Sequence, residues 1–161
     1  KTIVKEINDF QKDIINNLTH ITCYYGNIDI RHHLCREDNP KQKLTSLLNE
    51  YEKQIKELNI PNVELVAPLP IEDESRRLPK TGYFKGSPFY GSREQRQELQ
   101  KEMQNQLSEI CLKNKWSLFT WPEEWYQLDG ITFMKTYMES PKSVHLAPCY
   151  HRYNYWKEKF S

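Results

Sequence analysis

The sequence contains no hydrophobic run that approaches the ~20 residues needed to cross a bilayer. It also lacks a surplus of either charge, because its 23 basic and 22 acidic residues leave a formal net charge of +1. A chain with so little net charge creates no field that attracts nucleic acid. We therefore expect this 161-residue chain to have neither a membrane nor a nucleic acid as its partner.

Cysteine is scarce, and no C-x-x-C pair is present, which argues against a zinc ribbon or a redox dithiol. The four cysteines are Cys23, Cys35, Cys111 and Cys149. Cys23 lies in an apolar run and Cys111 on the apolar face of a predicted helix, so we expect buried free thiols. A reducing intracellular compartment or a virion fits this expectation best. The Lys-, Asn- and Ile-rich composition is typical of an AT-rich genome, such as that of a virus or phage.

Apolar spacing predicts an alternation of helices and strands. Spacings of three and four residues predict helices over residues 1–18, 41–58 and 92–116, with a closing helix over 150–160. Short apolar runs predict strands over residues 21–25, 63–70 and 117–121. Such alternation indicates a single α/β domain over residues 1–161 with a parallel sheet. Three strands are few for such a sheet, so we expect a protein partner or a missing N-terminal segment to cover its edge.

The most informative segment is residues 26–34, Gly-Asn-Ile-Asp-Ile-Arg-His-His-Leu. If the preceding strand continues past Gly26, then Asp29, Arg31 and His33 project to one side. Burying three ionisable groups is costly unless they pair with one another. Two interpretations follow: a structural pair of Asp29 with Arg31 that fixes the end of the strand, or a functional site.

Five residues of this segment stand at places that match the block Gly-Glu-[Ile/Val]-Asp-x-Arg-x-His: Gly26, Ile28, Asp29, Arg31 and His33, with Asn27 in the Glu position. Further matches lie downstream in Gly91-Ser92, Arg96, the turn 111–115 and His145-Leu146. In these features the chain resembles a branch of the SGNH, or GDSL, hydrolase superfamily over about residues 1–160. The resemblance implies a three-layer α/β/α, flavodoxin-like fold and cofactor-free hydrolysis of acyl esters, often on carbohydrates or lipids.

The resemblance also implies roles for individual residues. In the family a serine near the first strand attacks the ester carbonyl, and a C-terminal histidine, here His145, acts as the base. A glycine and an asparagine, here Gly26 and Asn27, help to form the oxyanion hole. Asp29, Arg31 and His33 would then brace the pocket.

The chain departs from the family pattern in three places. It contains no Gly-Asp-Ser block, so no serine nucleophile can be named. Lys142 stands three residues before His145, where the family has an aspartate, which leaves Asp129 or Glu139 as substitutes. The family spacing is Gly-x-Asn-Asp, whereas here the asparagine directly follows the glycine. Because the chain begins without methionine inside a helical pattern, we expect it to be the C-terminal part of a longer protein.

Three functions stay open at this point. The departures favour a degenerate SGNH-like domain that serves as a structural or glycan-binding module of a larger assembly. The alternative is an ester hydrolase whose serine lies upstream of Lys1. The third is a zinc-binding structural protein, on the types and spacing of His145, Cys149 and His151, with His32, His33 and Cys35 as further donors. Without paired C-x-x-C spacing, we assign no metal ligand.

The C-terminal half is rich in aromatic residues, among them Trp116, Trp121, Trp125 and Tyr126. Such rings stack on the apolar faces of sugars, but they more often form a core or an interface. We expect the core use for the segment 117–126, because it also has the pattern of a buried strand and its exit.

Overall fold

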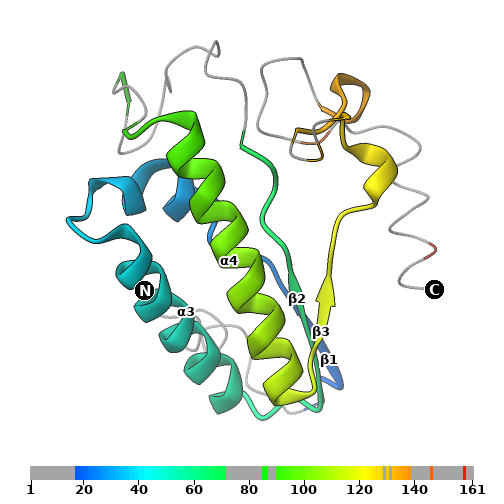
Figure 1. Cartoon of the computed structure of the whole chain (residues 1–161). Helices are drawn as coiled ribbons and strands as arrows, with labels where there is room; N and C mark the ends of the chain where they lie inside the picture. The colour runs from blue at the N-terminus through cyan, green and yellow to red at the C-terminus, as the bar shows by residue number, and fades with distance from the viewer. Residues whose placement is uncertain are drawn as a thin grey trace.

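The computed structural model describes residues 17–71, 85–86, 90–128, 130, 132–138, 146 and 158. Strands β1 (His20–Cys23), β2 (Asn62–Val66) and β3 (Ser117–Phe119) form a sheet in the order β1-β2-β3. Both neighbouring pairs are parallel, as Figure 1 shows. The predicted α/β class with a parallel, flavodoxin-like sheet is therefore confirmed. The predicted helices over residues 1–18 and 150–160 lie almost entirely outside the described residues, which include only 17, 18 and 158 of them.

Two long helices connect the strands, and local signals fix where each begins. Helix α3 (Pro40–Glu57) starts after Asn39, whose side-chain oxygen accepts the backbone N–H of Gln42. Helix α4 (Arg93–Asn114) starts after Ser92, which forms a reciprocal capping box with Gln95. The predicted start of this helix near residue 92 is confirmed. In the described part of the chain, no helix is both long and apolar enough to cross a membrane.

The strands are shorter than predicted. β2 ends at Val66, although the Ala67 N–H still donates to the carbonyl of Phe119 at 2.9 Å. Pro68 and Pro70 then follow, and a proline has no N–H for a further ladder bond. The prediction that strand continues to residue 70 is therefore wrong, and so is its extension to residue 121 in β3.

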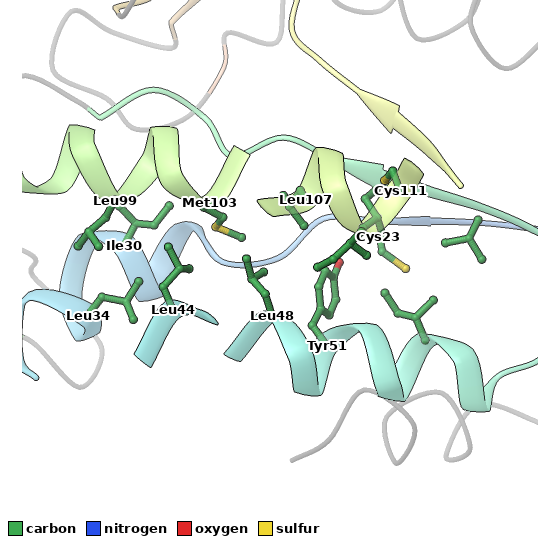
Figure 2. Close-up of a cluster of buried hydrophobic side chains, with 14 of the residues drawn as sticks. Cys23, Ile30, Leu34, Leu44, Leu48, Tyr51, Leu99, Met103, Leu107 and Cys111 are labelled. Atoms are coloured by element: carbon green, nitrogen blue, oxygen red, sulfur yellow. The ribbon is translucent and has the colours of Figure 1, made fainter. Parts of the chain in front are cut away.

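The main core lies between α3, α4 and one face of the sheet. Figure 2 shows side chains of the two helices pointing toward one another, with Cys23 of β1 beside Tyr51. Cys23 and Cys111 are buried free thiols, as expected. The buried residues labelled there on the helices are Leu44, Leu48 and Tyr51 of α3 and Leu99, Met103, Leu107 and Cys111 of α4.

A second cluster is built on alternate strand residues. Val63 and Leu65 of β2 belong to the main core, whereas Val66 belongs to the second cluster, together with Phe119 of β3. This division follows from the period of two in an extended strand. Ala67 follows β2, and the other buried members follow β3 in the sequence: Trp121, Trp125, Phe133 and Leu146. The second cluster therefore fixes the chain that leaves the carboxyl end of the sheet.

Candidate binding site at the carboxyl end of the sheet

Residues 26–34 are not extended, which corrects the sequence prediction. Gly26 has a φ of +94°, and its carbonyl accepts the N–H of Ile30 at 3.0 Å. A π-helical turn follows over Asp29–His33. Ile30 and Leu34, four residues apart, are only 1% and 2% exposed. Their helical spacing was the local signal for this turn, and burying both against the core favours it over a strand.

The helical turn moves Arg31 away from Asp29 and His33, which lie four residues apart and stay on one side of the turn. Arg31 is only 6% exposed, whereas His33 is exposed. Burial raises the pKa of Asp29, and the charge of His33 one turn later opposes that rise. The predicted common face of Asp29, Arg31 and His33 is therefore wrong. Their role in bracing a pocket stays a prediction.

Asn27 joins the two loops that leave β1 and β2. Its Oδ1 accepts the backbone N–H of Leu69 at 2.8 Å. Only the oxygen of an amide accepts an N–H, so this bond fixes the orientation of the side chain and leaves Nδ2 as a donor. Parallel strands end at the same edge of a sheet, which is why residues 42 positions apart meet here. Asn27 and the adjacent Gly26 thus lie at the edge where parallel α/β sheets bind ligands.

Tyr24 is the neighbour of Asn27 that sequence reasoning missed. Burial raises the pKa of Tyr24 to about 12, while the charge of Arg31 and hydrogen bonding by Asn27 and the Leu69 backbone oppose that rise. These three groups all stabilise negative charge at the tyrosine oxygen. Burial nevertheless outweighs all three, so the Tyr24 hydroxyl keeps its proton at neutral pH and is a hydrogen-bond donor at the carboxyl end of β1. The only sequence signal for Tyr24 was its position immediately after the strand.

Trp121 packs beside this region. Its Nε1 donates to the carbonyl of Ala67 at 2.9 Å, and its ring meets that of Tyr24 edge to face at 6.3 Å. Trp125 stacks on Trp121 at 6.1 Å, and both tryptophans are buried. The predicted core use of these two aromatic residues is confirmed.

An open pocket of about 620 Å³ lies between α4 and the segment that follows β3. Trp121 and Lys101 belong to its wall. The other lining residues are mostly polar and include Gln100, Gln104, Thr120, Glu123, Tyr126 and Gln127. The pocket therefore combines amides, two hydroxyls and two aromatic rings with one charge of each sign.

The predicted base, His145, lies outside the described residues, as do Asp129, Glu139 and Lys142. Leu146, the residue after His145, is buried in the second cluster and forms an antiparallel β-bridge with Met138. Cys149 and His151 of the zinc hypothesis also lie outside the described part. Within that part, no group of three or more His, Cys, Asp or Glu side chains is placed to hold a metal ion.

No protein-family model and no curated protein matches the chain. Among solved structures, it is similar to a gut microbial diltiazem-metabolizing enzyme, with 17% identity and a TM-score of 0.55. The match covers 98% of this chain and 36% of that chain. At this identity the similarity shows the fold alone. The chain thus spans about a third of the length of the solved structure that it resembles.

Proposed function

We propose that the chain forms the oxyanion side of an SGNH-like acyl-ester hydrolase. The observation that carries this proposal is the bond from the Leu69 N–H to Asn27 Oδ1 at 2.8 Å. An oxyanion hole needs a donor whose direction is set before the reaction begins. The bond to Leu69 sets that direction for Asn27 Nδ2, at the carboxyl end of two parallel strands.

The electrostatics of the region support the same role. The buried Arg31 guanidinium, Asn27 and the Leu69 backbone each favour negative charge at the oxygen of Tyr24, although burial outweighs them and raises the pKa of this phenol. A tetrahedral intermediate of ester hydrolysis carries negative charge on the former carbonyl oxygen, which such donors stabilise. The Tyr24 hydroxyl has a pKa of about 12, so it is protonated at neutral pH and is itself a further donor.

The nucleophile in this proposal is a serine upstream of Lys1, and His145 is the base. Within the described residues, β1 is an edge of the sheet. A parallel strand added at that edge would end beside Gly26 and Asn27, and it would bring its following residue to the oxyanion donor. The similarity to a metabolizing enzyme of greater length supports the occurrence of this fold within a longer enzyme.

The decisive experiment measures hydrolysis of p-nitrophenyl acetate by the longer protein and by its Asn27→Asp variant. Aspartate keeps the size of the side chain and an oxygen for the Leu69 N–H, but it removes the Nδ2 donor. We expect a fall in kcat of about 10²–10³-fold, as for loss of one oxyanion donor. Asn49→Asp, at an exposed position of α3, is the matched control and should leave kcat unchanged. An inert longer protein, or an active Asn27→Asp variant, would refute the proposal.

The second candidate is a module without chemistry. A hydroxyl and a histidine are in contact in β1, where Thr22 Oγ1 lies 3.3 Å from His20 Nε2. The position of this pair argues against a catalytic role, and it therefore favours the second candidate. This contact is exposed and lies within β1, before its carboxyl end, and Thr22 donates its proton to Glu64. It therefore does not form a nucleophile and base beside Asn27. A longer protein that folds but hydrolyses no ester would favour this candidate.

A further inference from the structure

We propose that the pocket between α4 and the segment after β3 binds the ring of a neutral sugar. This proposal does not depend on ester hydrolysis, because it concerns a different set of side chains. Asn27 and Tyr24 are not among the residues that line the pocket. Trp121 is the residue that contacts both Tyr24 and the pocket.

The first argument is an unsatisfied amide in the pocket wall. Gln100 is only 6% exposed, and its Oε1 accepts no hydrogen bond from any part of the chain that the structure describes. A buried acceptor without a donor is costly, and native proteins rarely leave one unpaired. Since Oε1 is itself covered in this structure, a hydroxyl group of a bound ligand supplies the missing donor once the Gln100 amide turns toward the pocket that Gln100 lines.

The second argument is the kind of polar group that surrounds Gln100. Gln127 donates its Nε2 to the carbonyl of Phe133 at 3.0 Å, which leaves its Oε1 as an acceptor. Gln104 and Thr120 each offer both a donor and an acceptor to the pocket. A sugar hydroxyl is likewise both donor and acceptor, so a ring with several hydroxyls matches this wall better than a ligand with a single polar group.

The charges at the pocket and the ring of Tyr126 restrict the class of ligand further. Lys101 and Glu123 place one charge of each sign at the pocket, so neither an anion nor a cation is favoured as a class. The ring of Tyr126 is half-buried, and it offers apolar surface to the C–H face of a pyranose. A neutral pyranose is therefore the ligand class that fits.

The test titrates the isotopically labelled 161-residue chain with glucose, galactose and N-acetylglucosamine, and with adenosine and glycine as comparators. We expect at least one pyranose to shift the side-chain amide signals of Gln100, Gln104 and Gln127 in the NMR spectrum. Gln100→Leu, which keeps a buried side chain of similar size, should weaken that binding about tenfold or more. Gln106→Leu is the control, because Gln106 lies on the same helix and donates instead to Thr45 and Glu102.

A second variant, Gln127→Ala, repeats the test at an exposed position, although it also removes the hydrogen bond to the Phe133 carbonyl. It should also weaken pyranose binding. The proposal is overturned if no pyranose shifts these amides, if adenosine or glycine is bound in preference, or if both variants bind as the unaltered chain does. If the chain binds a sugar but its longer form hydrolyses no ester, the proposed hydrolase activity is refuted and the proposed sugar site is supported.

Discussion

Gly26 lies directly against the end of the Met103 side chain, so that a β-carbon on Gly26 would overlap the Met103 Cε and Sδ atoms. Met103 is fully buried in α4, and Gly26 is the residue at which the chain turns away from β1. Its φ of +94° is also one that only glycine adopts readily. The backbone thus requires glycine at the start of the candidate site, and an added β-carbon would also have to displace the end of the buried Met103 side chain.

Gly26→Ala should therefore lower the free energy of unfolding by about 2–4 kcal/mol, the sum of backbone strain and overpacking. Urea unfolding measures this change. Gly86→Ala is the matched control, because Gly86 has a φ of +71° but no atom within 4 Å of an added β-carbon. If both substitutions cost the same, the contact with Met103 contributes nothing.

Glu52 of α3 accepts hydrogen bonds from Lys113 and Asn114 at the end of α4. These bonds between the helices should make the stability of the fold sensitive to acid. The hydrogen bond from Lys56 at 2.7 Å, with those from Asn114 and Lys113, lowers the pKa of Glu52 to about 2 although burial opposes the shift. The stabilisation is present above the ordinary pKa of 4.5 and is lost as the pH falls toward 2. Glu52→Gln should cost about 1–2 kcal/mol at pH 7 and flatten this dependence.

The control for Glu52 is Glu50→Gln. Glu50 is exposed on the same helix and accepts a hydrogen bond from Gln54. Unfolding of the three proteins between pH 2 and pH 7, followed by circular dichroism, should show the flattened dependence in Glu52→Gln alone. An equal effect of both substitutions would assign the acid sensitivity to net charge rather than to the bond between the helices.

Features with local causes were predictable from the sequence, and features with distant causes were not. Ser92 with Gln95, and Asn39 with Pro40, are short-range signals, and each marks the start of its helix correctly. In contrast, no local pattern indicates that Asn27 bonds to Leu69, 42 residues away, because the sheet brings them together.

The prediction of an extended conformation for residues 26–34 failed for a related reason. The period of two in the charged residues of this segment was real, but the apolar pair Ile30 and Leu34 decided the conformation, because burying both against the core outweighs the alternation of charged residues. Likewise Gln100 has the identity of a surface residue, and its burial depends on the segment that follows β3. The sugar pocket was therefore not predictable from α4 by itself.

The two buried thiols should make the fold sensitive to alkali. Burial raises the pKa of Cys23 and of Cys111 from 9.0 to about 11. Between these values the unfolded chain releases protons that the folded chain keeps, so stability falls as the pH rises from about 9 to 11. Each thiol contributes a slope of up to about 1.4 kcal/mol per pH unit.

The double variant Cys23→Ala, Cys111→Ala should show a shallower decline in this range, even if it is less stable at pH 7. Urea unfolding at several pH values measures the two slopes. Cys35→Ala, at a half-buried position, is the comparison. An unchanged slope in the double variant would show that tyrosines, and not these thiols, cause the alkaline loss.

Among the aromatic residues at the carboxyl end of the sheet, Trp121 should contribute most to the stability of the fold. It packs against Phe119, Trp125 and Phe133 in the second cluster, and its Nε1 donates to the carbonyl of Ala67. Trp121→Phe keeps an apolar ring but removes the donor from a buried carbonyl and leaves a gap. We expect a loss of about 2–4 kcal/mol in the free energy of unfolding.

Trp116→Phe is the matched control, because Trp116 is only partly buried at the margin of the main core, and it should cost less than half as much. A second readout links Trp121 to the candidate site. Since the Trp121 ring packs edge to face against Tyr24, which is already 41% exposed, Trp121→Phe should expose the phenol further and lower the pKa of Tyr24 from about 12 toward 10, which ultraviolet titration detects. A stable Trp121→Phe variant with an unaltered Tyr24 titration would mean that the loops after β1 and β2 hold the site without support from the second cluster.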